Sequence, residues 1–555
     1  MPFTSTAQMK AGVASKVVAE PTLSISAAIE KGYKAAVLMW QIDAETGNRM
    51  SAQFSGVVVS PDGVILSAAH VVMPGNTYKV MFADGRDCIA KGLGRITIPP
   101  NYMVPDAAIL KIAGTGVWPY AEMGWSSSLT IGQPCISIAY PESQAQRKPM
   151  IRFGKISSLK NEYGFVQSTC VMEPGDSGGP LFDLLGRVIG IHSGIQIPED
   201  VNYEVPIDTY RKYWAALNQA KDYQALPADS TVIARDPVKH QGIDKAALLD
   251  LEKQAIQVDQ SHKGNVVILR SILDGSAQQI AGTVLSAKGL SSKKSGTVII
   301  SKSSMLGANP VALDAHGREL KLRVVGRNRA DDLVVLLAEK HPGSGIGLFA
   351  NASDSTADER AGRFLISLIA DSAARIGVLG SLHVDLPNAT SYGYMGASTE
   401  IKNDTLRFKS VSPTGAAASA GIKAGDMVST IDGAQVQDEL DFMKAVGSYQ
   451  AGDTIQVGIT SAGKRAIKPV VLKYPPQRQV NHPAELFAGG KSDRRDGFKD
   501  VSIQDARIQA KECGGPVFDL NNRFVGINIA RLSRTSTLIV PANKIVHYLR
   551  SLGYK

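Results

Sequence analysis

An internal repeat constrains the fold of this chain more than any other feature. Landmarks that lie before residue 220 recur in the same order after residue 260. The matched segments, first copy then second, are residues 55–60 and 281–286, 64–70 and 297–304, 105–110 and 332–337, 177–183 and 513–519, and 205–206 and 540–541. A chain that repeats its landmarks in order repeats its architecture. The apolar runs between turn residues are typical of strands, so we predict one β-rich domain built twice.

The second copy is interrupted. The segment 152–159 recurs as 375–382. In the first copy Ser177 follows this segment closely, whereas in the second copy Cys513 stands much farther along the chain. The excess is about 110 residues, which is the size of a small domain with its linkers. Compact guests are tolerated in exposed loops when their two ends lie close together. We therefore predict a guest domain inside the second copy, held by two tethers.

The turn Gly-Asp-Ser-Gly-Gly-Pro at residues 175–180 is the most informative chemical motif of the first copy. Glycines on both sides of Ser177 let the backbone turn sharply and direct its N–H groups toward the serine oxygen. A serine hydroxyl becomes a nucleophile only with a base and an orienting acid. His70 ends one apolar run upstream, and Asp106 opens another. The chain order His, Asp, Ser is one of those in which such triads occur.

The motifs Ser-Ala-Ala-His, Pro-Asp-Ala-Ala-Ile-Leu-Lys and Gly-Asp-Ser-Gly-Gly-Pro together resemble the HtrA/Deg branch of chymotrypsin-like serine endopeptidases, over about residues 28–220. The resemblance implies that His70 is the general base and that Asp106 orients and stabilises its imidazolium. It also implies that Ser177 attacks the scissile carbonyl. The N–H groups of Gly175 and Ser177 would form the oxyanion hole.

The same resemblance assigns substrate-binding residues. Asp176 departs from the asparagine common in this branch but matches the wider chymotrypsin-like motif. The residue six before the nucleophile lies at the base of the primary pocket in such folds, and here it is Val171. A neutral aliphatic floor favours small or medium apolar side chains over Lys or Arg. Ile191, His192 and Ser193 would form the edge that pairs with the substrate strand. A triad needs no metal or cofactor, so none is expected.

The second copy lacks the base. Ser304 stands where the first copy has its histidine, Asp332 matches the aspartate, and Cys513 replaces the serine. A thiol becomes nucleophilic when an adjacent imidazolium or helix N-terminus lowers its pKa, and the matched position offers only Ser304. We interpret Cys513 as a small buried hydrophobe and the second copy as a pseudoprotease. A cysteine protease that uses Cys513 is the alternative.

A third module, at residues 391–477, resembles the PDZ domains of HtrA-type proteases. Its start, Tyr-Gly-Tyr-Met-Gly, is similar to their carboxylate-binding loop, which assigns Tyr394, Met395 and Gly396 to peptide binding. PDZ domains bind an extended peptide as an added strand and capture its terminal carboxylate with backbone N–H groups. A packing module with a blocked groove is the alternative.

The composition argues against several other classes of protein. No apolar run approaches the roughly 18 residues of a membrane helix, so we expect no membrane span. The net charge of +9 is modest for 555 residues and the basic clusters stand among acidic or polar residues, so we expect no nucleic-acid partner. The four cysteines have no paired or metal-type spacing, so neither a metal site nor a disulfide framework is expected.

The compartment is not readable from the first residues. Residues 1–20 lack the continuous apolar segment of a secretory leader. HtrA-like proteins are mostly exported to the bacterial cell envelope, so the resemblance implies the periplasm or envelope, with the cytoplasm as the alternative. Such relatives often trimerise, but no residue here requires it, so a homo-oligomer is left open.

The predicted fold class is mainly β: two chymotrypsin-like double β-barrel domains, one active and one degenerate, plus an α+β PDZ domain. The expected parts are an N-terminal segment (1–27), the active domain (28–220), a linker (221–259), the discontinuous pseudoprotease (260–390 and 478–555) and the inserted PDZ module (391–477). The predicted function is ATP-independent serine endoproteolysis of unfolded or C-terminally exposed polypeptides, with C-terminal peptides bound at the PDZ module. An inactive, chaperone-like peptide-binding protein is the alternative.

Overall fold

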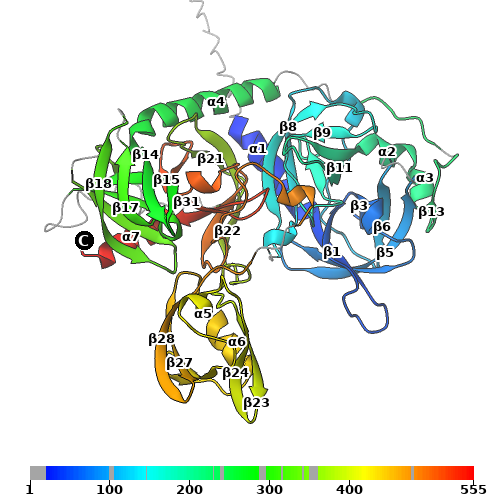
Figure 1. Ribbon diagram of the computed structural model, residues 1–555. Helices are drawn as coiled ribbons and strands as arrows, with labels where there is room; N and C mark the ends of the chain where they lie inside the picture. The colour runs from blue at the N-terminus through cyan, green and yellow to red at the C-terminus, as the bar shows by residue number, and fades with distance from the viewer. Residues whose placement is uncertain are drawn as a thin grey trace, which may run out of the picture.

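The computed structural model describes residues 21–98, 105–144, 147–228, 230–237, 243–286, 296–313, 317–339, 343–348, 360–476 and 480–554, with the backbone only at 21–24 and 243–247. Antiparallel strands dominate these residues. They form two pairs of barrels and one separate sheet (Figure 1).

The first pair of barrels lies between residues 36 and 223. One ring closes through the pairing of β5 with β6, and β13 joins β5 in parallel. Its strands are β1 (Ala36–Ile42), β2 (Phe54–Val58), β3 (Val64–Ala68), β4 (Thr77–Phe82), β5 (Asp87–Ile96), β6 (Ala107–Ile112) and β13 (Asp222–Tyr223). The other barrel comprises β7 (Pro134–Ala139), β8 (Met150–Ser158), β9 (Val166–Ser168), β10 (Pro180–Phe182), β11 (Val188–Ile195) and β12 (Asn202–Pro206). Strands β2, β3, β7 and β10 are buried along their whole length, which explains why none of them contains a charged residue.

The second pair of barrels repeats this arrangement. One ring closes through β14 and β15. Its strands are β14 (Val266–Leu273), β15 (Ser276–Ser286), β16 (Thr297–Lys302), β17 (Ala308–Leu313), β18 (Glu319–Asn328) and β19 (Leu333–Ala338), with β20 (Ile346–Gly347) beside β15. The other barrel comprises β21 (Phe364–Ser367), β22 (Arg375–Val384), β29 (Val501–Gln504), β30 (Pro516–Asp519), β31 (Phe524–Arg531) and β32 (Thr537–Pro541).

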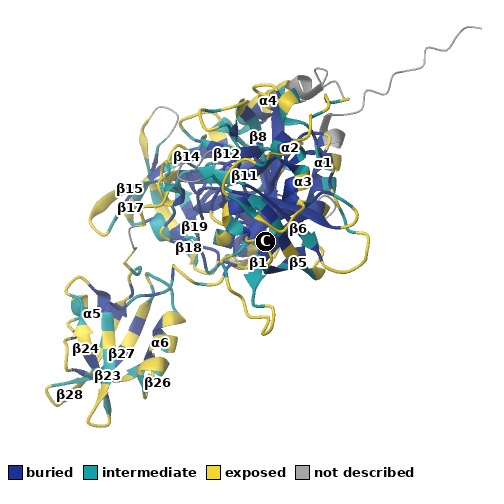
Figure 2. Cartoon of the chain, turned by 90° about the vertical axis from the view of Figure 1, so that its right-hand side faces the viewer, coloured by how far each residue is buried: buried dark blue, intermediate teal, exposed yellow. Residues whose placement is uncertain are grey.

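Between β22 and β29 the chain leaves this barrel and forms the separate sheet, which projects from the barrels (Figures 1 and 2). Its elements are β23 (Ala397–Lys402), β24 (Thr405–Val411), α5 (Ala416–Ser419), β25 (Met427–Ile431), β26 (Ala434–Gln435), α6 (Glu439–Gly447), β27 (Thr454–Ser461) and β28 (Lys464–Val471). The sheet and its two helices enclose a hydrophobic cluster of their own. The flanking strands β22 and β29 pair with each other. This topology is the one expected of an inserted guest, whose boundaries stay a prediction.

Few helices accompany the strands. They are α1 (Pro21–Ala35), α2 (Ile207–Lys212), α3 (Trp214–Leu217), α4 (Ile243–His262) and α7 (Ala542–Ser551). Helix α4 lies along one side of the second barrel pair and reaches the first at one end, so that it contacts β7 of the first domain and β21 of the second (Figure 1). It therefore holds the two barrel pairs together along one side.

The predicted fold class is confirmed: the fold is mainly β, with closed six-stranded barrels consistent with trypsin-like barrels and a PDZ domain. Within the described ranges, we find no helix with the length and apolar character needed to cross a bilayer.

A buried carboxylate joins the two barrel pairs. Asp505, which follows β29, accepts hydrogen bonds from the N–H of Phe153 in β8 (2.9 Å) and of Val378 in β22 (2.6 Å). Burial raises the pKa of Asp505 to about 6, against the opposing effect of these two bonds and of nearby arginines. The carboxylate thus satisfies one backbone donor on each side of the interface.

We expect Asp505→Ala to lower the free energy of unfolding by about 2–4 kcal/mol, because it leaves two interface N–H groups without an acceptor. Chemical denaturation followed by tryptophan fluorescence measures the change. The control is Asp371→Ala, which removes an exposed carboxylate between β21 and β22 and should cost less than about 0.5 kcal/mol. Identical unfolding curves for the two variants would show that Asp505 does not hold the interface.

Candidate active site

Antiparallel pairing of two strands brings His70 and Asp106 together. Strands β3 and β6 pair so that Ala68 lies opposite Ala107. His70 follows β3 in the 3₁₀ helix η1 (Ala69–Val71), and Asp106 immediately precedes β6. His70 Nδ1 lies 2.8 Å from Asp106 Oδ2, and the His70 backbone N–H donates to Oδ1 at 2.9 Å. One carboxylate therefore holds both the ring and the backbone of the histidine.

Ser177 lies on the opposite side of the imidazole. The loop before β10 places Ser177 Oγ 2.9 Å from His70 Nε2. Ser193 Oγ donates to Asp106 Oδ2 at 2.7 Å, which fixes the carboxylate. Burial lowers the pKa of His70, but the hydrogen bond and charge of Asp106 outweigh burial and hold that pKa above its ordinary value. The arrangement can therefore pass a proton from the serine hydroxyl to a suitably basic ring.

Two glycines in the left-handed region shape the turn around Ser177. Gly175 has a φ of +96° and Gly178 a φ of +82°, a geometry that residues with a Cβ rarely adopt. A Cβ at Gly178 would lie 2.0 Å from Ser67 Oγ, so only glycine fits there. Among the described residues, no acceptor takes the N–H of Gly175 or Ser177. Both donors are thus available to a negatively charged oxygen.

A buried ion pair anchors the same turn. Arg152 in β8 and Asp176 are each 1% exposed, and the guanidinium contacts both carboxylate oxygens, at 2.9 and 3.0 Å. Asp176 Oδ2 also accepts from the N–H of Glu173 at 2.8 Å. Burial raises the pKa of Asp176, and the charge of Arg152 opposes that shift. The pair fixes the residue directly before Ser177.

Sequence reasoning missed the role of Arg152, although a signal was present. Arg152 opens the repeated segment 152–159, and its counterpart in the second copy is Arg375. Arg375 pairs with both oxygens of Glu512, the residue before Cys513, at 2.8 and 2.7 Å. An arginine and an acid at matched positions in both copies would have predicted both pairs.

A cleft of about 480 Å³ opens beside Ser177. Residues 172–174 line one part of it, and residues 193–195 line another. His482 and Pro483 also line the cleft, although they belong to the segment that follows the separate sheet. No sequence motif indicated that this distant segment would reach the site.

The four predicted substrate-binding residues are not gathered in one place. Ser193 and His192 line the cleft, but the His192 side chain is fully buried, 2.6 Å from Glu204 Oε2 and 2.7 Å from Ser137 Oγ. Ile191 is fully buried within the hydrophobic core. Val171 lines a second cavity, whereas the next residue, Met172, lines the cleft.

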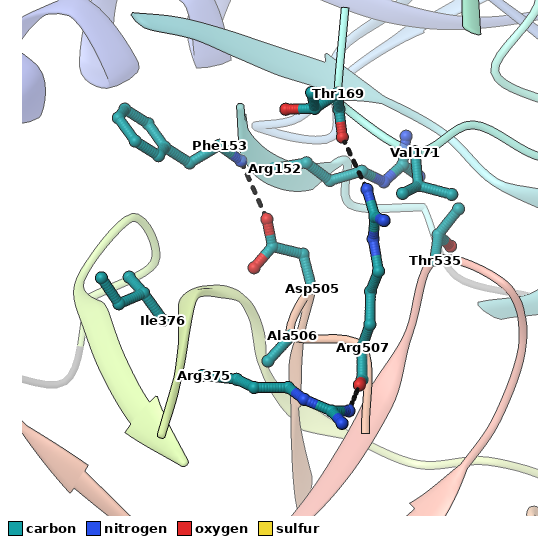
Figure 3. A pocket seen from close by; sticks show the side chains of 10 residues that line it. All are labelled: Arg152, Phe153, Thr169, Val171, Arg375, Ile376, Asp505, Ala506, Arg507 and Thr535. Carbon is teal, nitrogen blue, oxygen red and sulfur yellow. Dashed lines mark hydrogen bonds between the residues drawn. The ribbon is translucent and has the colours of Figure 1, made fainter. Parts of the chain in front are cut away.

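This second cavity, of about 320 Å³, lies where the two barrel pairs meet (Figure 3). The first domain contributes Arg152, Val171 and Thr169, and the second contributes Asp505 and Arg507. Arg507 donates to the Thr169 carbonyl at 3.2 Å, so the second domain contacts the chain two residues before Val171. The residue expected at the floor of the primary pocket is therefore part of the domain interface.

At the position that matches His70 and Asp106 of the first copy, the second copy has different contacts. The N–H and Oγ of Ser304 both donate to Asp332, each at 2.7 Å. The ammonium of the fully buried Lys302 lies 2.9 Å from Asp332 Oδ2. Cys513 is also fully buried, and burial raises the pKa of its thiol to about 11. The thiol is therefore protonated at neutral pH and is a weak nucleophile.

The predicted peptide loop lies at the start of β23, the outermost strand of the separate sheet, beside helix α6. Tyr394 exchanges two backbone hydrogen bonds with Lys473, at 2.8 and 3.0 Å. Met395 is buried in the core of the module, and Gly396 has a φ of +72°. In the part of the chain that the structure describes, no acceptor takes the N–H of Met395 or Gly396.

Two family models match the sequence: a trypsin-like peptidase domain over residues 54–191 and a PDZ domain over residues 393–466. The first contains His70, Asp106 and Ser177, and the second contains the predicted peptide loop.

Similar proteins carry related descriptions. A probable periplasmic serine endoprotease of the DegP-like kind from Hahella chejuensis is 26% identical over 432 residues, covering 76% of this chain and 80% of the relative. Another, from Pseudomonas fluorescens, is 34% identical over 161 residues, covering 28% and 32%. Serine protease HTRA1 of Xenopus laevis is 25% identical over 298 residues, covering 52% and 60%. The chain therefore has a trypsin-like peptidase domain and a PDZ domain, is similar to HtrA and DegP-like serine endoproteases, and is a serine-type endopeptidase.

Proposed function

We propose that His70, Asp106 and Ser177 act as the catalytic triad of this protease. The observation that carries the proposal is the line of contacts from Asp106 Oδ2 to His70 Nδ1 (2.8 Å) and from His70 Nε2 to Ser177 Oγ (2.9 Å). His70 takes the hydroxyl proton as Ser177 attacks the scissile carbonyl, and then gives it to the leaving amine. Asp106 stabilises the imidazolium meanwhile. A water activated by His70 then releases the acyl group from Ser177.

The N–H groups of Gly175 and Ser177 bind the carbonyl oxygen as negative charge develops on it. In related chemistry, loss of one such donor costs about 10²–10³ in turnover, so the shape of the turn matters as much as the triad. The ion pair between Arg152 and Asp176 supports this role, because it holds the peptide unit that joins the two donors.

The DegP-like relatives support polypeptides as substrates, and their periplasmic descriptions support the cell envelope as the compartment. We propose that the protease cleaves unfolded or C-terminally exposed polypeptides. The free edge of β23 would receive a C-terminal peptide as an added strand, with its carboxylate at the N–H groups of Met395 and Gly396.

The second copy, at residues 260–390 and 478–555, is proposed to be a pseudoprotease. Ser304 and Asp332 bond each other instead of activating a nucleophile, and the buried Cys513 thiol keeps its proton. Lys302 neutralises Asp332 inside the protein. These contacts favour a structural role for the second copy over a second catalytic centre.

We expect Ser177→Ala and His70→Ala each to lower casein hydrolysis at least about 10³-fold, because triad residues act as a unit. Circular dichroism spectra should match that of the wild type. A fluorophosphonate probe should label the wild-type protein at Ser177, located by peptide mapping, and neither variant.

Cys513→Ala is the matched control and should leave turnover within about twofold, since no base activates that thiol. Wild-type protein that neither reacts with the probe nor cleaves casein would favour the inactive, chaperone-like alternative. A large loss of turnover in Cys513→Ala at an unchanged melting temperature would favour a cysteine protease.

The protonation of His70 predicts a pH profile. Only the neutral ring can accept the serine proton, and Asp106 holds the pKa of His70 above its ordinary value of 6.5. We therefore expect kcat/KM for a fluorogenic peptide to rise with pH through a midpoint above 6.5. The rate of fluorophosphonate labelling should rise with pH through the same midpoint, because labelling needs the same neutral ring. A midpoint below the ordinary pKa of His70, or different midpoints for cleavage and for labelling, would contradict this assignment.

A further inference from the structure

The cleft beside Ser177 has a wall that comes from the second barrel pair. We call residues 480–491, which follow the separate sheet, the strap. His482 and Pro483 of the strap line the cleft together with Gly194 and Ile195 of β11. The substrate cleft is therefore composite, with the reacting groups on one domain and part of the wall on the other.

A buried arginine of the second barrel pair fastens the strap to the first domain. Arg534, at the tip of the β31–β32 hairpin, is fully buried. Its guanidinium donates to the carbonyls of Pro483 (3.0 Å), Gln196 (2.7 Å) and Pro198 (2.9 Å). Gln196 directly follows Ile195 in the β11–β12 loop. One side chain thus sets the distance between the strap and the first-domain wall that it faces.

Two further contacts hold this hairpin and the end of the strap region in place. Arg531 Nη2 lies 3.0 Å from Glu199 Oε1 in the β11–β12 loop. Ser492, immediately after the strap, exchanges two hydrogen bonds with the backbone of Arg531, each at 2.9 Å. Burial lowers the pKa of Arg531 to about 10, but the side chain stays charged at neutral pH. The strap is consequently anchored at both Pro483 and Ser492.

The strap presents a defined chemistry to the cleft. His482 Nδ1 accepts the N–H of Ala484 at 3.1 Å, at the start of the 3₁₀ helix η7 (Pro483–Glu485). Because Nδ1 accepts, the proton of the neutral ring lies on Nε2, which becomes a hydrogen-bond donor. Pro483 adds a rigid apolar surface beside it. The two residues thus offer one donor and one apolar contact.

We propose that His482 and Pro483 form a specificity-determining wall for polypeptide substrates, and that Arg534 is the residue that positions it. This inference rests on the proposed function, because it takes Ser177 as the acylated residue. A substrate chain that extends past residues 193–195 lies between that edge and the strap. The strap then selects substrates with an oxygen acceptor toward His482 and an apolar group toward Pro483.

The test compares a substrate that fills the cleft with one that does not. For the full-length protein, kcat/KM is measured for an extended fluorogenic peptide and for p-nitrophenyl acetate, and cleavage sites in casein are mapped by mass spectrometry. We expect His482→Ala to lower the peptide-to-ester ratio of kcat/KM about five- to tenfold, the effect of one lost hydrogen bond, and to shift the cleavage sites. Leu486→Ala, an exposed strap residue that is not among those lining the cleft, is the matched control and should keep the wild-type ratio.

Arg534→Ala should lower the same ratio through a higher KM for the peptide, and Arg534→Lys should recover part of it. Because Arg534→Ala can also unfold the hairpin, His482→Ala decides the outcome. An unchanged ratio and unchanged cleavage sites in His482→Ala, with Ser177 still labelled by fluorophosphonate, would overturn this inference alone. Wild-type protein whose Ser177 does not react with that probe would overturn the proposed function and this inference with it.

Discussion

The buried ion pair between Arg152 and Asp176 is the contact on which the site most depends. It ties the turn that carries Ser177 to strand β8. The next residue of β8, Phe153, donates its N–H to Asp505 of the second barrel pair. Removing one partner of a buried ion pair typically costs about 3–5 kcal/mol, because the other charge is left unpaired. The nucleophile turn and the domain interface are therefore fixed by neighbouring residues of one strand.

The second copy has an equivalent pair, although its matched site has a serine in place of the histidine and a cysteine in place of the serine. Arg375 and Glu512 occupy the matched positions and bond through both oxygens, although the residue that follows is a buried cysteine with no activated thiol. An arginine–acid pair that stands beside a buried cysteine serves the shape of the turn. In the second copy this turn is bonded to β31, because the N–H of Gly514 donates to the Asn528 carbonyl, and β31 leads into the hairpin that reaches the first domain.

The sequence predicted the features that depend on a local pattern of residues. It missed the features that depend on how distant segments pack together. The mainly β fold, the trypsin-like domain and the PDZ domain could be read because each is carried by short runs with their own turn residues. The domain bounds and the roles of His70, Asp106 and Ser177 stay predictions. The contribution of His482 could not be read, because it depends on how two domains pack. Counting back from Ser177 placed Val171 at the primary pocket. Val171 lines the cavity between the barrel pairs and the next residue, Met172, lines the cleft, so this assignment stays a prediction.

The segment that follows the PDZ module reaches the cleft of the first domain, where His482 lines the wall. A bound peptide alters cleavage through this segment only if it favours one of two strap positions. Arg534 holds the strap through backbone carbonyls and Ser492 holds its far end, so the second barrel pair, more than the PDZ module, determines where the strap lies. A peptide captured by the PDZ module, as proposed above, would then act chiefly by raising the local concentration of substrate at the cleft.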